Sequence, residues 1–189
     1  SVWRIHRKIG MSGGLFANIL LRETGLEITA ERLDRLRQWH AEAFNRQHAQ
    51  GSVRPLPGAR ELLDYLTEQQ IPWAIATSGR METAAPNLQA LGVDPSKVPV
   101  VTRDQVRHAK PDPDLFLAAA ARLGVDIQQS LVIGDSVWDM LAAQRARGLG
   151  VGLLSGGYGH AELQQSGAFR VYGDPADLLR HIDEVAARD

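Results

Sequence analysis

Two aspartates four residues apart, Asp135 and Asp139, have the spacing in this chain that points most directly to chemistry. They follow the apolar run 131–133 and Gly134, a pattern typical of a buried strand that leads into a helix. Asp135 would end the strand and Asp139 would lie in the first turn of the helix, facing the same crevice. Carboxylate oxygens are the ligands that Mg²⁺ prefers, and ligands of open α/β sheets bind at this end of the strands. We therefore expect Asp135 and Asp139 to bind Mg²⁺ and, through it, a phosphate.

Two other loops carry polar side chains that suit the same chemistry. Thr77 comes at the end of a predicted strand over 73–77, and Lys110 follows a predicted strand over 98–102. The carboxyl ends of neighbouring strands in such a sheet converge on one crevice. A phosphoryl group needs hydrogen-bond donors, positive charge and a metal ion. The Thr77 hydroxyl would be the hydrogen-bond donor, the Lys110 ammonium the positive charge, and the paired acids the ligands of the metal ion.

Each of these residues also has a purely structural explanation. Thr77 and Ser78 could cap the helix that follows them, which is a common use of Ser and Thr. Lys110 could be an ordinary exposed lysine. Asp135 could be a helix N-cap, with Asp139 complementing the helix dipole. Their combination in one α/β frame favours the functional interpretation.

The periodicity of apolar residues predicts the elements that hold these loops. Residues 1–52 read as an all-helical cap domain, and the segment 54–58, with prolines and a glycine, reads as a linker. Residues 53–189 read as an α/β core, a doubly wound parallel sheet with helices on both faces. The expected helices are 59–70, 81–91, 113–123, 138–147 and 175–187, and the expected strands are 73–77, 98–102, 131–134, 151–154 and 170–172.

Composition narrows the class of protein. The chain has 189 residues, of which 44% are hydrophobic and 23% charged, and its formal net charge is −1. These values are typical of a globular protein and favour neither a nucleic-acid nor a membrane partner. The chain has no cysteine, which fits a reducing compartment, and we expect a cytoplasmic protein. No apolar run approaches the roughly 20 residues that a membrane-spanning helix needs.

Taken together, these motifs resemble the haloacid dehalogenase superfamily, in particular its phosphatases with a small helical cap, such as phosphoglycolate phosphatases and β-phosphoglucomutase. The second family motif matches Thr77, Ser78 and Gly79 at a strand end. The third matches Lys110 in a Lys-Pro-x-Pro-Asp setting, and the fourth matches Gly-Asp-x-x-x-Asp over 134–139. The resemblance covers the whole chain.

The resemblance implies a role for each residue. Thr77, Ser78 and Gly79 would bind phosphoryl oxygens. Lys110 would hold the nucleophile and the phosphate together. Asp135 would bind Mg²⁺ directly, and Asp139 would bind it directly, bind it through water or orient a ligating water. Thr77, Lys110 and Asp135 form the implied catalytic set.

One departure from the family is large. Its first motif, Asp-x-Asp-Gly, supplies the nucleophilic and the acid/base aspartates, and this sequence does not contain it. We expect a truncated polypeptide, with the nucleophile upstream of Ser1 and a core that lacks its first strand. Such a sheet would have a gap or two unpaired edges. The segment as written is then expected to be inactive alone.

The predicted cap loop 8–14 is the candidate for substrate selection. Gly10 and Ser12 lie in it, and Arg7 and Lys8 at its start would meet an anionic leaving group or simply form a basic, solvated helix end. The arginine that reorients phosphate in β-phosphoglucomutase-like caps has no counterpart here, which favours a hydrolase. Tyr158 and His160 either border the pocket or belong to the core and a turn.

The leading hypothesis is a Mg²⁺-dependent phosphatase that acts on a small phosphorylated metabolite through an aspartyl-phosphate. The alternatives are a phosphomutase, a dehalogenase proper and a non-catalytic remnant without the nucleophile. A dehalogenase needs no metal, so the pair Asp135 and Asp139 argues against it. We expect a monomer.

Overall fold

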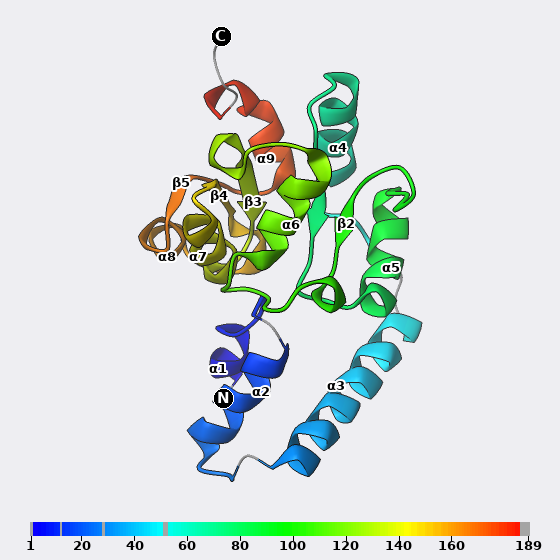
Figure 1. The fold of residues 1–189 in the computed structure, drawn as a ribbon, viewed down its shortest axis with the longest axis vertical. Coiled ribbons are helices and arrows are strands. Elements are labelled where there is room, and N and C mark those ends of the chain that lie inside the picture. Colours follow the sequence, from blue (N-terminus) through cyan, green and yellow to red (C-terminus); the bar gives the residue numbers. More distant parts are fainter. Residues whose placement is uncertain (1, 12, 28, 51–52, 186–189) are drawn as a thin grey trace.

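The computed structural model describes residues 2–11, 13–27, 29–50 and 53–185. Three helices come first: α1 (Val2–His6), α2 (Gly13–Thr24) and α3 (Ala30–Gln50). They lie together on one side of the α/β part of the molecule (Figure 1). The described part of the first 50 residues is therefore mostly helical, as expected, and non-helical turns at 7–11 and 25–27 lie between the helices. The division into a cap and a core stays a prediction, and residues 51–52 of the expected boundary lie outside the described residues.

The α/β part alternates strands and helices. Its helices are α4 (Ala59–Glu68), α5 (Met81–Leu91), α6 (Asp114–Leu123), α7 (Val137–Ala146), α8 (His160–Gln165) and α9 (Pro175–Arg180). Its strands are β1 (Ile75–Ala76), β2 (Val100–Val101), β3 (Leu131–Gly134), β4 (Leu149–Leu153) and β5 (Ala168–Tyr172). Short 3-10 turns are found at Arg103–Gln105, Ile127–Gln129, Leu154–Gly156 and Ile182–Glu184.

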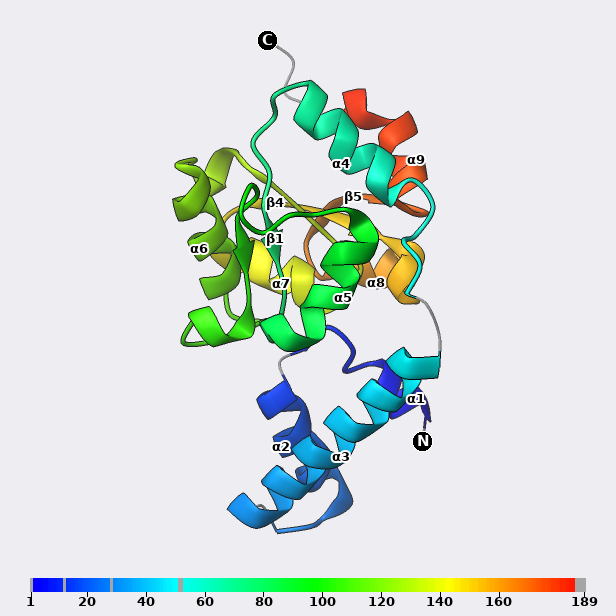
Figure 2. The same cartoon turned by 90° about the vertical axis from the view of Figure 1, so that its right-hand side faces the viewer.

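The described strands form two separate parallel sheets, one with the order β1-β2 and one with the order β3-β4-β5. β1 and β3 are therefore both edge strands, and the absence of the core's first strand stays a prediction. Apolar clusters cover both faces of the larger sheet. On one face, Val151 of β4 packs in a cluster with Leu178 of α9 and with α4. On the other face, Met140 of α7 and Leu163 of α8 pack in a cluster with Ala168 of β5. Figure 2 shows α4 beside α9 at the end of the molecule opposite α1–α3.

Several expectations about these elements were wrong in detail. The predicted buried run 131–133 is only partly buried, because Val132 faces α6 and α7 whereas Leu131 and Ile133 are 39% and 37% exposed on an edge strand. The helix expected over 175–187 ends at Arg180, since His181 leaves the helical conformation. Helix α8 was not predicted. Its first turn is closed by Glu162, whose carboxylate accepts the Gly159 N–H at 2.7 Å.

Gly58, at the start of α4, packs closely against the start of α9. Its φ is +73°, and a Cβ added there would lie 2.4 Å from the Cα of Ala176 at the start of α9. We expect Gly58→Ala to lower the free energy of unfolding by about 2 kcal/mol more than Gly124→Ala. Gly124 is the matched control, with a φ of +69° and nothing within 4 Å of an added Cβ. Equal losses in urea unfolding would show that the contact with Ala176 is unimportant.

Within the described ranges, no helix is both long and apolar enough to cross a membrane.

Candidate active site

The loop after β3 positions the two aspartates. Ser136 is the N-cap of α7, and its hydroxyl accepts the Asp139 N–H at 3.3 Å. Asp139 returns the interaction, because its Oδ2 accepts the Ser136 N–H at 3.1 Å and also the Ser136 hydroxyl. The N-cap of α7 is therefore Ser136 and not Asp135, so capping does not explain Asp135. Asp139 lies in the first helical turn, as predicted.

Lys110 is buried and paired. Its Nζ donates to Asp139 Oδ1 at 2.6 Å, and the two residues are 8% and 5% exposed. The alternative of an ordinary exposed lysine is therefore wrong. Both carboxylate oxygens of Asp139 are engaged, one by Lys110 and one by Ser136. This arrangement leaves Asp135 as the better placed of the two acids for direct contact with a cation.

The Asp135 carboxyl is partly buried next to Asp139. Burial raises its pKa above the ordinary value, the Asp139 carboxylate raises it further, and the Lys110 ammonium offsets part of the increase. The ionised form of Asp135 is therefore disfavoured in the folded chain. A cation bound at this position would reverse that cost, so the donor chemistry fits Mg²⁺. Among the described residues, no three His, Cys, Asp or Glu side chains are placed to hold a metal ion together, so further oxygen ligands would be water, phosphate or other residues.

The raised pKa predicts how stability depends on pH. The folded state binds the Asp135 proton more tightly than the unfolded state, whose pKa is about 3.9. Stability is then lost as the pH rises from that value through the folded pKa. In EDTA at pH 7, we expect Asp135→Asn to have a higher Tm than the wild type, with a difference that narrows toward about pH 4. A lower Tm for Asp135→Asn across this whole range in thermal melts would contradict the burial of a charged carboxylate.

The loop after β1 carries the predicted phosphate-binding residues. The Thr77 N–H donates to the Val101 carbonyl at 2.9 Å, and Thr77 Oγ1 accepts the Gly79 N–H at 3.0 Å. The N-cap of α5 is Arg80, and no side chain caps it. The alternative that Thr77 or Ser78 caps this helix is therefore wrong. Thr77 shapes the turn, and Ser78 donates through Oγ to the Gly10 carbonyl at 3.4 Å.

Gly10 brings the loops after β1 and β3 together. It has a φ of +89°, and a Cβ added to it would lie 2.5 Å from Ser136 Oγ. Since Ser78 also contacts Gly10, both predicted loops meet at one residue of the helical part. Gly10 therefore lies next to both loops, and the role of its own loop in substrate selection stays a prediction. Ser12 lies outside the described residues.

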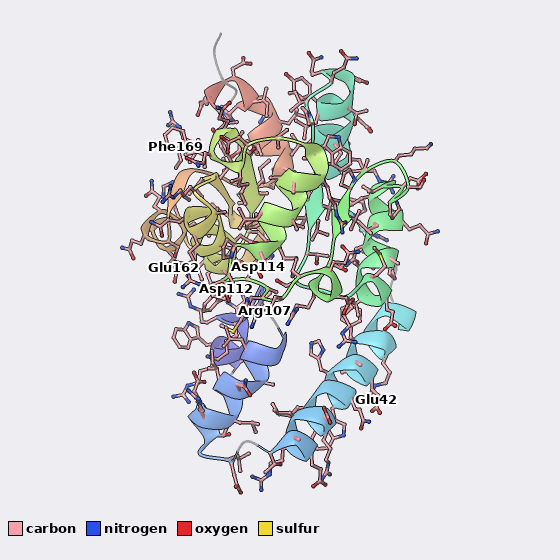
Figure 3. All side chains as sticks on the ribbon, in the orientation of Figure 1. Glu42, Arg107, Asp112, Asp114, Glu162 and Phe169 are labelled. Carbon is pink, nitrogen blue, oxygen red and sulfur yellow. The ribbon has the colours of Figure 1, made fainter. Side chains whose placement is uncertain are left out.

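The two basic residues of this loop are both in ion pairs within the chain. Arg7 pairs with Glu162 of α8, and its guanidinium lies over the Tyr158 ring at 5.0 Å from the ring centre. Lys8 pairs with Glu23 at 2.7 Å. Figure 3 shows Asp112 and Glu162 on the side of the α/β part that faces α1. In this conformation neither cation is free to bind a leaving group.

Sequence reasoning missed the contacts that seat α1 on the α/β part. Tyr158 is 3% exposed, and its hydroxyl donates to the Ile9 carbonyl at 3.2 Å. Its ring stacks on His6, and the Trp138 Nε1 donates to the Arg7 carbonyl at 3.3 Å. Tyr158 is therefore a buried residue on which the segment of His6 and Ile9 packs. His160 is exposed at the start of α8. These partners are about 130 to 150 residues apart, and no local pattern signals them.

Comparison with known proteins supports this interpretation of the motifs. A family model for haloacid dehalogenase-like hydrolases matches residues 10–147. An N-acetylmuramic acid 6-phosphate phosphatase from Pseudomonas aeruginosa is 29% identical over 177 residues, which cover 93% of this chain and 77% of that protein. A phosphoglycolate phosphatase from Pectobacterium atrosepticum is 33% identical over 168 residues, covering 86% of this chain and 70% of that protein. Three other curated phosphatases are matched over 43%, 46% and 58% of their own length.

A solved structure is also similar over nearly the whole chain. The crystal structure of a hydrolase from Pseudomonas syringae is 56% identical and superposes with a TM-score of 0.94. The match covers 99% of this chain and 84% of that one.

Proposed function

This chain belongs to the haloacid dehalogenase-like hydrolase family, as the motifs at Thr77, Lys110 and Asp135 predicted, and we propose that it is part of a Mg²⁺-dependent phosphatase. The proposed substrate is a phosphate monoester of a small metabolite. The main support is that the buried Lys110–Asp139 pair lies beside Asp135. The loop after β3, which carries Asp135, also meets the Thr77 loop at Gly10.

The roles proposed for the residues follow from their contacts. Thr77, Ser78 and Gly79 form a turn whose hydroxyl and N–H groups would bind phosphoryl oxygens, which requires the Gly79 N–H to leave Thr77 Oγ1 when phosphate binds. The Lys110 ammonium, held by Asp139, would supply positive charge to the phosphate and to an anionic nucleophile. Asp135 would be the direct ligand of Mg²⁺, and Asp139 would act through Lys110 or a bound water. Bound Mg²⁺ would neutralise charge on the phosphoryl oxygens.

The proposed reaction has two steps and uses two aspartates from residues that precede Ser1. A carboxylate oxygen of the first would attack phosphorus, and the ester P–O bond would break to give an aspartyl-phosphate. The second would donate its proton to the departing alkoxide. It would then take a proton from water, and the water oxygen would attack phosphorus to release inorganic phosphate and restore the first aspartate.

The names of the relatives support a small phosphorylated substrate without identifying it. One acts on N-acetylmuramic acid 6-phosphate and another on phosphoglycolate, and these leaving groups differ in size and functional groups. The shared feature is the phosphate monoester, which the residues at Thr77, Lys110 and Asp135 would recognise.

Trapping the intermediate tests the proposal. The full-length protein would be mixed with a substrate that it turns over, quenched in acid within one turnover and weighed by mass spectrometry. We expect a mass increase of one phosphoryl group that needs Mg²⁺, on a peptide that precedes Ser1. Turnover without any phosphorylated form would contradict the two-step reaction. Conversion of a sugar phosphate to its isomer without phosphate release would identify a mutase instead, and a protein with no turnover and no Mg²⁺ binding would be a non-catalytic remnant.

A further inference from the structure

The Ser136 hydroxyl lies between the helical part and the buried ion pair. Ser136 is 1% exposed, and its Oγ contacts Asp139 on one side. On the other side it faces Gly10, since a Cβ on Gly10 would lie 2.5 Å from Ser136 Oγ and 2.9 Å from its Cβ. Ser136 therefore touches both a residue of the cap loop and a residue of the ion pair.

Asp139 depends on Ser136 for the orientation of its carboxylate. Oδ1 accepts from Lys110 at 2.6 Å, and Oδ2 accepts from the Ser136 N–H at 3.1 Å as well as from the hydroxyl. Without the hydroxyl, Oδ2 would keep one donor and the carboxylate could rotate about its last bond. Such a rotation moves the oxygen that holds the Lys110 ammonium.

Gly10 can approach Ser136 this closely because it has no side chain. Its φ of +89° is a conformation that other residues rarely adopt, and any Cβ would overlap the serine. The Gly10 carbonyl also accepts a hydrogen bond from Ser78 at 3.4 Å. Gly10 is therefore in contact with both the loop after β1, through Ser78, and the loop after β3, through Ser136.

From these contacts we infer that Ser136 is a positioning residue that couples the seating of Gly10 to the orientation of the Asp139–Lys110 pair. The inference rests on the proposed function for its effect on catalysis. When the loop is seated, Gly10 holds the Ser136 hydroxyl against Asp139, and the pair is set for the phosphate. When the loop leaves, the hydroxyl gains room to turn away. The position of the Lys110 ammonium would thus depend, through the Ser136 side chain, on whether Gly10 is in contact with Ser136.

Ser136→Ala in the full-length protein tests the catalytic part of the inference. We expect kcat to fall about 10- to 100-fold with KM changed less than about 3-fold, because a misoriented Lys110 affects the transition state more than substrate binding. The matched control is Asp126→Ala. Asp126 caps the turn before β3, at the opposite end of that strand, and accepts the Gln128 N–H at 2.9 Å. A loss of kcat that is equal in both variants, or a rise in KM alone, would overturn the positioning role.

Gly10→Ala tests the coupling, with Gly25→Ala as its control. Gly25 is in the same helical part, has a φ of +70° and has nothing within 4 Å of an added Cβ. We expect Gly10→Ala alone to lower kcat about 10-fold, and to add less than about 3-fold when Ser136→Ala is already present. Independent, multiplicative effects of the two substitutions would overturn the coupling.

Hydrogen–deuterium exchange gives a readout that needs no turnover. In Gly10→Ala, the peptide over 134–140 is expected to exchange faster than in the wild type, whereas Gly25→Ala leaves its exchange unchanged. Unchanged exchange in Gly10→Ala would overturn the inference even if the protein proves not to be a phosphatase. An inactive wild type would count against the proposed function, and the exchange result would still decide whether Gly10 and Ser136 are coupled.

Discussion

Asp135→Asn is expected to lower kcat of the full-length protein by about 100- to 1000-fold while the protein stays folded. Asp135 is the partly buried acid of the site whose pKa is raised, and the oxygens of its neighbour Asp139 are already engaged by Lys110 and Ser136. An amide would keep the shape and remove the charge that attracts Mg²⁺. Steady-state phosphate release and calorimetric Mg²⁺ titration would measure both effects.

Asp112→Asn is the matched control for this experiment. Asp112 is two residues from Lys110, and its side chain forms an exposed pair with Arg145 at 3.4 Å. Its loss should change kcat less than about 2-fold, since exposed pairs contribute little. Unchanged turnover and unchanged Mg²⁺ dependence in Asp135→Asn would remove the basis for the metal assignment.

Lys110→Met is expected to lower the free energy of unfolding by about 3 kcal/mol, because it leaves the Asp139 carboxylate buried without its cation. The side chains of the pair are 10% and 7% exposed, so solvent screens the remaining charge poorly. Urea unfolding in EDTA would measure the loss. Lys97→Met is the control, since Lys97 is 81% exposed and lies 3.9 Å from Asp94, and its loss should be under about 1 kcal/mol.

The double variant Lys110→Met/Asp139→Asn separates a charge effect from a packing effect. Removing both charges should recover part of the stability that the single variant loses. A double variant that is less stable than Lys110→Met by the full cost of Asp139→Asn would mean that the two side chains act independently. That result would contradict the buried ion pair.

The sequence predicted which loops would meet, because that follows from the direction of parallel strands. Thr77, Lys110 and Asp135 follow apolar runs, and residues at the carboxyl ends of such strands face one crevice. The helices α5 and α7 agree with the ranges read from apolar periodicity to within a residue. The family followed from the same motifs and is confirmed.

The sequence could not predict which partner each side chain would take. Lys110 and Asp139 are 29 residues apart, and their pairing depends on how two loops pack. Arg7 and Lys8 looked available to an anionic substrate, but Glu162 and Glu23 hold them. The capping role of Ser136 was hidden because aspartate is as good an N-cap as serine, so Asp135 was an equal candidate.

Phosphate release by the full-length protein from a panel of small phosphate monoesters, with Mg²⁺ and with EDTA, would decide whether the protein is a Mg²⁺-dependent phosphatase. We expect release from at least one ester with Mg²⁺, none with EDTA, and none above background from Asp135→Asn in either condition. Release that EDTA and Asp135→Asn leave unchanged would contradict a Mg²⁺-dependent phosphatase, and so would a protein that hydrolyses no ester in the panel while dechlorinating a haloacid without metal.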